Sequence, residues 1–479
     1  MTQISPDQIA ANALRLLGPL PPNWVPELPG VDHDVLVVGG GHTGSTFAFA
    51  LQRAGITRFS VIDAAADESQ SGVWLTRARM NLLRTPKNLP GPELGVQGLG
   101  FQSWYEAQHG EQAFTNLLRI PRTEWAAYLT WYRRALGLKI RYATRLVRIE
   151  PADGHFRAHL EIAGVPHIET ARKIILGNGV AGSGHPYFPE VLQPALPSGL
   201  LAHTAEAIDF AALKDRKIAV VGGAASAFDA AATALEAGAA EVHLFARRAE
   251  LAALPVLRAR GYPGAYDNYG HLPDAIRWQQ AVRYRDAGST APIDAVERAT
   301  KFPNFHLHLA APWSSVRVQN GKLHASAAKG DFVYDFAIAG TGYKVDLAAR
   351  PELADFASEI RLWRDQYTPP ADLADAFYGQ HPYLGFGHEF LEKTPGAAPF
   401  LNNIHVYNPG GFVSFGLPIG DVPSIRRDVP AVVAAISRDL LLQDLAHHQQ
   451  RFNADVPPDF TAELYARSVW GRRTAEAAD

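Results

Sequence analysis

The chain has 479 residues, 47% of them hydrophobic, and its 45 basic and 48 acidic side chains give a net charge of -3. This length predicts two or three domains, and the lack of any block of like charges argues against nucleic acid or a membrane surface as a partner. The absence of cysteine excludes disulfides, thiolate nucleophiles and Cys-ligated metal centres. No run approaches the ~18 apolar residues of a membrane span and no signal peptide is recognisable, so we expect a cytoplasmic protein without a bound metal.

In chain order, helical apolar spacing over residues 5–17 and a proline-rich stretch after it predict an N-terminal helix and strap over 1–30. A βαβ unit follows at 34–63, and 71–120 is expected to be largely loop. Residues 122–137 predict a helix, and strands are expected around 139–151, 155–162 and 172–179. The remaining expected elements are a proline-rich linker at 184–199, a second βαβ unit at 217–248, one strand in 332–346 and a helix near 428–442.

The first βαβ unit carries a GxGxxG turn placed directly between a strand and a helix, which is the context that makes this motif specific. Gly39 permits the tight turn, Gly41 lets the backbone approach a pyrophosphate, and Gly44 allows close helix–strand packing. The helix N-terminus adds free N–H groups and a positive dipole end. Asp63 ends the next strand, where a carboxylate accepts hydrogen bonds from ribose hydroxyls. This unit predicts a dinucleotide site.

The second unit is a weaker copy, because alanine replaces the middle and last glycines of the turn. Its second strand ends in two arginines where the first unit has an acid, and guanidinium groups there suit a 2′-phosphate. This pattern predicts NADPH, although the arginines could also be a solvated strand end. The residues expected to contact it are Gly222, Ala224, Ser226, Arg247 and Arg248.

Two different dinucleotide sites in one chain indicate that a hydride passes from an exchanging NADPH to a fixed FAD. The predicted fold class is α/β, with two Rossmann-like dinucleotide-binding domains and the NADPH domain inserted into the FAD domain. The expected FAD-binding domain comprises 31–200 and 331–479, and the NADPH-binding domain 205–330.

The sequence resembles the FAD- and NADPH-dependent class B flavoprotein monooxygenases over most of its length. The resemblance rests on both βαβ units and on four short motifs: "SGVW" at 71–74, "GLLAHT" at 199–204, "GTGY" at 340–343 and "NPGGFVSFGLPIGD" at 408–421. It implies that Trp74 lies near the flavin ring and that Leu146 contacts the adenine of FAD, with simple core packing as the alternative for each. The further cofactor contacts that it implies are Gly342 and Tyr343, which link the domains, and Gly411 and Asp421 near the flavin pyrimidine.

The resemblance also suggests residues for the chemistry. The loop at 77–95 falls where the family places groups above the flavin, so Asn81, Arg84 and Lys87 are candidates, with a purely structural role as the alternative. His203 aligns with a histidine of the Baeyer–Villiger signature FxGxxxHxxxW. Pro197 and Ala207 stand where that signature has Phe and Trp, which disfavours ketone oxidation, and a buried structural role for His203 is an equal alternative.

The resemblance implies an enzyme that uses NADPH and O₂ to oxygenate a small molecule, at nitrogen or sulfur, through a flavin C4a-hydroperoxide. Three alternatives stay open: Baeyer–Villiger oxygenation of a ketone, an FAD/NADPH reductase that passes electrons to a partner, and a non-catalytic redox sensor. A homo-oligomer is compatible with the sequence, and the substrate cannot be inferred from any motif.

Overall fold

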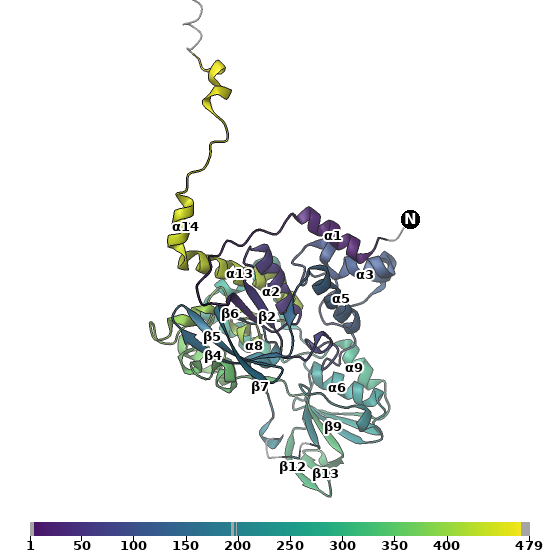
Figure 1. Ribbon diagram of the computed structural model, residues 1–479. Coiled ribbons are helices and arrows are strands. Elements are labelled where there is room, and N and C mark those ends of the chain that lie inside the picture. Colours follow the sequence, from purple (N-terminus) through teal and green to yellow (C-terminus); the bar gives the residue numbers. More distant parts are fainter. Residues whose placement is uncertain (1–3, 193–195, 198, 471–479) are drawn as a thin grey trace, which may run out of the picture. The chain divides into compact units, whose positions relative to one another are not determined.

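The computed structural model describes residues 4–192, 196–197 and 199–470, and Figure 1 shows the arrangement of its helices and strands. The chain divides into two compact units, 1–437 and 438–479. The first holds the sheets and the predicted sites. The second, as far as it is described, contains α14 (Leu445–Phe452) and two short 3-10 turns, and α13 (Val422–Gln443) runs from the first unit into it.

The first unit begins with α1 (Pro6–Leu17), as predicted. Ser5 caps this helix, since its hydroxyl accepts a hydrogen bond from the Gln8 N–H while the Gln8 side chain accepts one from the Ser5 N–H. The proline-rich segment after α1 has extended or irregular backbone up to β1 (His33–Val38), which agrees with the expected strap.

The first sheet is built around the predicted βαβ unit, β1–α2–β2. β1 pairs in parallel with β2 (Phe59–Ile62) on one side and β6 (Val165–Leu176) on the other, and α2 (His42–Arg53) connects β1 to β2. β3 (Ile140–Arg141) and β17 (Ile404–Val406) extend the parallel part. β4 (Thr144–Ala152) and β5 (His155–Ile162) continue from β6 as an antiparallel meander. β17 brings a distant part of the chain into this sheet.

The second sheet is parallel throughout, in the order β11 (Phe305–His308), β10 (Glu241–Phe245), β9 (Lys217–Val221), β15 (Phe336–Ala339) and β8 (Leu201–His203). β8 and β15 lie outside the predicted 205–330 segment, so the sheet extends further in both directions than that range. The sequence did not predict that β8 and β15 belong to this sheet, because neither short strand has a pattern that identifies its pairing partner.

Both faces of the second sheet are covered, as a parallel sheet requires. α6 (Ala225–Glu236) and α9 (Ile293–Thr300) pack on one face, against residues such as Ile218 and Val242 (Figure 1). A three-stranded antiparallel sheet of described residues covers the other face through Trp313, Leu323 and Tyr334; its strands are β12 (Trp313–Gln319), β13 (Lys322–Ala327) and β14 (Gly330–Tyr334).

The segment 71–120 is largely loop, as predicted, and α3 (Phe101–His109) and α4 (Glu111–Asn116) form in its last part, where they pack their aromatic side chains against α5 (Arg122–Ala135). One sequence expectation was wrong. The single strand expected in 332–346 is three: β14, β15 and β16 (Tyr343–Val345), of which β16 pairs with β7 (Gly184–Pro186). β7 lies in the expected linker 184–199, of which 193–195 and 198 fall outside the described residues.

The remaining α-helices of the first unit are α7 (Pro263–Asn268), α8 (Asp274–Ala287), α10 (Trp363–Gln366), α11 (Ala376–Gly379) and α12 (Phe412–Phe415). The expected helix near 428–442 forms as part of α13, which begins earlier, at Val422. Within the described ranges, no helix combines the length and the apolar character that crossing a membrane requires.

Candidate active site at the two glycine turns

The first glycine turn is shaped by close backbone packing. Gly39 has a φ of 107°, and a Cβ there would lie 2.3 Å from the carbonyl oxygen of Gly177. A Cβ on Gly44 would lie 1.9 Å from the carbonyl oxygen of Gly39. Side chains at these two positions would therefore push α2 away from β1 and the neighbouring strand, which is why both must be glycine.

Gly41 is different, because its side of the turn is open. It precedes α2 with extended backbone, and a Cβ there would meet only the Cα of Gly72, at 3.8 Å. The first N–H groups of a helix have no acceptor within the helix, and those of α2 point toward this side. An opening that a Cβ would fill, beside a helix N-terminus, fits the pyrophosphate of a dinucleotide.

Asp63 lies directly beside this turn, at the end of β2. Its Oδ2 accepts hydrogen bonds from the Gly40 N–H at 2.8 Å and the Ser71 hydroxyl at 2.9 Å, and its Oδ1 accepts one from the Ala65 N–H at 2.8 Å. The Asp63 carbonyl also accepts a hydrogen bond from Thr144, at the start of β4, and Leu146 is buried two residues further on. The structure thus brings Asp63, Ser71 and the β4 segment together around the turn.

Trp74 lies next to the same turn and rests on an aromatic cluster. Its ring packs edge-to-face on Trp125 of α5 at 6.3 Å and lies 5.7 Å from the ring of His42, the first residue of α2. The cluster beneath also contains Phe101, Tyr128 and Tyr132. A partly exposed tryptophan supported in this way can form a rigid, apolar wall of a cofactor site.

His42 is a site residue that the sequence reasoning missed. Its Nε2 lies 2.8 Å from the carbonyl oxygen of Gly420, so it joins the start of α2 to the 408–421 motif. Burial lowers the pKa of His42 to about 4, so the ring is neutral beside the positive end of the helix. The available signal was its position inside the glycine turn, immediately after Gly41.

Arg133 was also missed. This buried side chain of α5 reaches the back of the turn, where it donates hydrogen bonds to the Gly40 carbonyl at 3.3 Å, the Ser45 hydroxyl at 2.9 Å and Glu68 at 3.0 Å. It fixes the glycine turn against α5. Only tertiary packing reveals this role, because its sequence context is an ordinary amphipathic helix.

The 408–421 motif reaches the start of α2 through Gly420. Gly411 is buried, and a Cβ there would lie 3.1 Å from Ile419. Asp421 caps α13, since its Oδ1 accepts a hydrogen bond from the Ser424 N–H at 3.0 Å, and burial raises the pKa of Asp421 to about 7. The structure therefore places the start of α13 beside the start of α2.

In the second glycine turn, a glycine from a neighbouring strand leaves space for one of the alanines. Gly222 has a φ of 142°, and a Cβ on it would lie 2.3 Å from the Gly340 carbonyl oxygen. A Cβ on Gly340 would lie 2.7 Å from the Ala227 Cβ, so Gly340 provides the room that Ala227 takes. Ala224 precedes α6 with extended backbone, and Ser226 is partly buried in the first turn of that helix.

The two predicted phosphate-binding arginines differ in the structure. The Arg248 guanidinium donates hydrogen bonds to the carbonyls of Arg285, Asp286 and Ala287, at the end of α8. Arg247 is exposed, and no hydrogen bond or ion pair of its side chain occurs within the described part of the chain. Arg247 is therefore the arginine that remains available to a phosphate.

The "GTGY" motif connects the second sheet to β7. Gly342 has a φ of 83°, its carbonyl accepts a hydrogen bond from the Tyr187 N–H, and Tyr343 begins β16. The Tyr343 ring packs 5.5 Å from that of His203, which is fully buried at the end of β8. The His203 Nδ1 accepts a hydrogen bond from the Ala205 N–H, which agrees with the structural alternative for this residue.

The three polar candidates of the 77–95 loop do not converge on one point. Lys87 donates three hydrogen bonds, to the carbonyls of Phe114, Thr115 and Leu117 around the end of α4, so its ammonium is used structurally. Arg84 forms an ion pair with the buried Asp229 of α6 at 3.1 Å.

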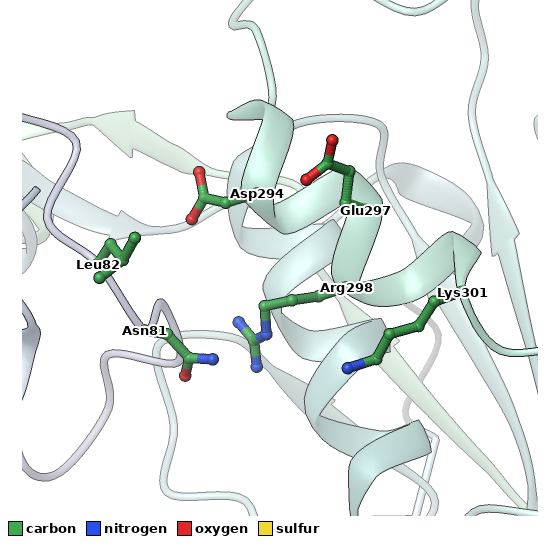
Figure 2. A pocket seen from close by; sticks show the side chains of 6 residues that line it. All are labelled: Asn81, Leu82, Asp294, Glu297, Arg298 and Lys301. Carbon is green, nitrogen blue, oxygen red and sulfur yellow. The ribbon is translucent and has the colours of Figure 1, made fainter. Parts of the chain in front are cut away.

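Asn81 lines a cavity of about 410 Å³ instead. Figure 2 shows its side chain and the Arg298 guanidinium extending toward each other from opposite sides of this cavity. The other lining residues are Leu82 of the loop and Asp294, Glu297 and Lys301 of the α9 region. The described lining contains no residue of either glycine turn, so this cavity is separate from the openings for the two dinucleotides.

The loop at 77–95 does, however, connect the first glycine turn to the second sheet. Arg79 donates hydrogen bonds to the carbonyls of Thr204 at 2.6 Å and Glu206 at 2.8 Å, just after β8, and its own carbonyl accepts one from Arg298 of α9. Together with the Arg84–Asp229 ion pair, these contacts hold the loop that follows Trp74 against the second sheet and its helices.

Comparisons with known proteins identify the family of this chain. A family model described as pyridine nucleotide-disulphide oxidoreductase matches residues 36–256. The chain is 39% identical over 414 residues to the FAD-dependent urate hydroxylase of Xanthomonas campestris pv. campestris, an alignment that covers 86% of this chain and 87% of the relative.

Solved structures share the fold. The ornithine hydroxylase of Pseudomonas aeruginosa, in its reduced form, matches with a TM-score of 0.65 at 18% identity, over 86% of this chain and 100% of that one. The cadaverine monooxygenase of Erwinia amylovora, solved with FAD bound, matches with a TM-score of 0.63 at 14% identity, over 84% of this chain and 94% of that one. The predicted fold class and the cofactors FAD and NADPH are confirmed, and the chain belongs to the class B flavin-dependent monooxygenases.

Proposed function

We propose that this monooxygenase uses NADPH and O₂ to oxygenate a small, nitrogen-containing substrate, and that urate and related purines are the first compounds to test. The observation that carries the proposal is the pair of glycine turns, each between parallel strands of a separate sheet, with the loop after Trp74 held against the second sheet and its helices. Such an arrangement suits hydride transfer between two dinucleotides.

The fit of FAD to the first turn is supported by the open side of Gly41 and the ribose-binding position of Asp63. When bound, FAD supplies the two-electron chemistry and the activation of O₂. The chain contributes the phosphate-binding N-terminus of α2. Trp74 and the aromatic cluster below it exclude water from one side of the site. His42, neutral and bonded to Gly420, keeps the start of α2 beside the start of α13.

We assign NADPH to the second turn, with Gly222, Ala224 and Ser226 at its pyrophosphate and Arg247 at its 2′-phosphate. Arg247 is favoured over Arg248 because the latter guanidinium is already bonded to three carbonyls. The membership of β8 and β15 in this sheet supports an NADPH-binding domain of about 201–339, with the FAD-binding domain formed by the segments on either side.

The loop after Trp74 has a positioning role in this proposal. Arg79 and Arg84 hold it against β8 and α6, so the side chains between Trp74 and Lys87 lie between the two nucleotide units. Asn81 is exposed there and is retained as a candidate for contact with the nicotinamide or the substrate.

The substrate class is supported by the relatives. The similar proteins are a hydroxylase of urate and monooxygenases of ornithine and cadaverine, all of which are nitrogen compounds. The mismatches at Pro197 and Ala207 to the Baeyer–Villiger signature weigh against a ketone. A reductase that transfers electrons to a disulfide would need the cysteine pair that this chain lacks.

The test is to load the protein with FAD and measure NADPH oxidation, O₂ uptake and ¹⁸O incorporation from ¹⁸O₂ into product. The panel comprises urate, other purines, ornithine, lysine, cadaverine, a thioether and a cyclic ketone. We expect a nitrogen compound to stimulate NADPH oxidation and to acquire one ¹⁸O atom per NADPH. Labelled ester from the ketone alone, or NADPH oxidation without ¹⁸O in any organic product, would contradict the proposal.

A further inference from the structure

The second sheet carries a cluster of potential metal ligands that the proposed function does not use. Glu241 and His243 alternate along β10 and therefore point to the same face of the sheet. His306 of β11 is the direct register partner of His243, so its side chain lies on that face as well. Lys217 of β9 pairs in register with Glu241.

The ligand atoms of the three residues lie close together. The Nε2 atoms of His243 and His306 are each 3.1 Å from Oε1 of Glu241, and the three atoms all lie within 4.8 Å of one another. Bonds of ~2.0–2.1 Å in a tetrahedral zinc site separate neighbouring ligand atoms by about 3.3 Å. Only small side-chain adjustments would bring the three atoms to the distances that a metal requires.

We propose that Glu241, His243 and His306 bind one Zn²⁺ or a similar first-row divalent cation. Two imidazoles and one carboxylate suit such a metal, whereas Mg²⁺ and Ca²⁺ prefer an all-oxygen set. The Nε2 of His243 is buried and faces Oε1 of Glu241, so a metal would take the place of the proton between these two atoms. The site holds three protein ligands and leaves a fourth position for water.

The surroundings orient one ligand and leave the site accessible. The Nδ1 of His243 lies 2.9 Å from Nε2 of His308, and the His308 ring is stacked on Phe245 at 4.5 Å. A hydrogen bond at Nδ1 directs Nε2 toward the metal, as is usual for metal-binding histidines. The His306 side chain is 44% exposed, which provides an entry path.

Lys217 is the main obstacle to a cation. Its ammonium lies 2.8 Å from Oε2 of Glu241, whereas Oε1 faces the two histidines, and the lysine side chain is 58% exposed and can turn outward. The loss of this ammonium is therefore expected to tighten metal binding.

The position of the cluster indicates what the metal does. Glu241 begins β10, whereas the Gly222 turn follows the opposite, carboxyl end of β9. The metal would link β10 to the edge strand β11 and would not contact the dinucleotide. We therefore expect it to stabilise the second sheet without changing the affinity for NADPH. No sequence motif marks this cluster, because its ligands come from two strands more than 60 residues apart.

The experiment uses full-length protein without a histidine tag, treated with a chelator and exchanged into chelator-free buffer. Isothermal titration with Zn²⁺ should show one site per chain, and Co²⁺ should give the intense visible absorption of a four- or five-coordinate ion. Saturation with Zn²⁺ should raise the melting temperature, because it binds the folded state. Failure to bind FAD or to oxygenate a substrate would not affect these measurements.

Three variants and one control sharpen the test. His306→Ala should weaken Zn²⁺ binding at least tenfold, and His308→Ala, which removes only the orienting group, should weaken it about 10- to 100-fold. Lys217→Ala should tighten it. His155→Ala, in the first sheet, should leave it unchanged. The proposal would be overturned by an absence of stoichiometric binding in the wild type, or by equal affinities of the His306→Ala and His155→Ala proteins.

Discussion

Alanine at Gly44 should lower the stability of the apoprotein, whereas alanine at Gly41 should weaken FAD binding, although both residues belong to the same motif. At Gly44 the new Cβ would lie 1.9 Å from the Gly39 carbonyl oxygen and 3.2 Å from a methyl group of Val61, so α2 must move away from the sheet. Overpacking of this kind costs about 1–3 kcal/mol. At about 2.1 cal/mol/K of unfolding entropy per residue, a chain of 479 residues loses about 1 °C per kcal/mol, so the apoprotein should melt about 1–3 °C lower.

At Gly41 the new Cβ meets only the Gly72 Cα, at 3.8 Å, and the backbone has a φ of -65°, which alanine adopts readily. The apoprotein should keep nearly its full stability. The Cβ would, however, occupy the approach of the pyrophosphate to the first N–H groups of α2. Loss of one charge-assisted hydrogen bond costs about 1.5–3 kcal/mol, so FAD should bind about 10- to 150-fold more weakly.

Thermal melting of the apoproteins and titration of FAD by flavin fluorescence measure the two effects separately. Alanine at Gly18, where a Cβ has nothing within 4 Å but φ is 86°, serves as a control for backbone strain remote from the turn. If the Gly41→Ala protein bound FAD as the wild type does, or melted as low as the Gly44→Ala protein, the assignment of roles within this turn would be refuted.

Three further predictions follow from the site. Arg247→Ala should raise the KM for NADPH about tenfold or more and leave the KM for NADH unchanged, whereas Arg248→Ala should mainly lower the melting temperature because its guanidinium binds the end of α8; steady-state kinetics with both coenzymes would separate them. Burial raises the pKa of Asp421 from 3.8 to about 7, so the folded apoprotein holds a proton that the unfolded chain releases, and its stability should fall by up to about 4 kcal/mol as the pH rises from 4 to 7. Asp421→Asn should flatten this dependence in urea denaturation, and an unchanged slope would count against the buried carboxyl. Lys87→Met should destabilise the protein by about 1–3 kcal/mol, because three carbonyls lose their donor, while the rate of NADPH oxidation by the folded, FAD-loaded enzyme stays within about twofold.

Much of the nucleotide chemistry could be predicted from the sequence, because it depends on residues that are neighbours in the chain. The strand, glycine turn and helix around Gly39 lie within one 30-residue segment, although the carbonyl oxygen that restricts Gly39 belongs to the distant Gly177. The same reasoning identified the second βαβ unit, at 217–248. It also favoured arginine at the strand end, where Arg247 indeed remains available.

The tertiary structure decided how these segments meet. Chain neighbours cannot show that Arg248 binds the end of α8, that Lys87 binds the carbonyls around the end of α4, or that Gly340 accommodates Ala227. Each of these outcomes depends on contacts between residues far apart in sequence. The contacts of His42 with Gly420 and of Arg133 with Gly40 likewise join residues far apart in sequence, so the sequence did not predict them.

The histidines of the second sheet are the clearest example of a cluster that only strand pairing reveals. Two short strands with alternating polar residues look like ordinary edge strands, and nothing local distinguishes His243 from His306. Parallel pairing in one register places them side by side, with Glu241 within reach of both. The sequence by itself determined the two nucleotide-binding units, because local backbone geometry and helix N-termini are encoded by adjacent residues. Strand register and helix docking decided which side chains face one another, because these depend on the packing of the whole first unit.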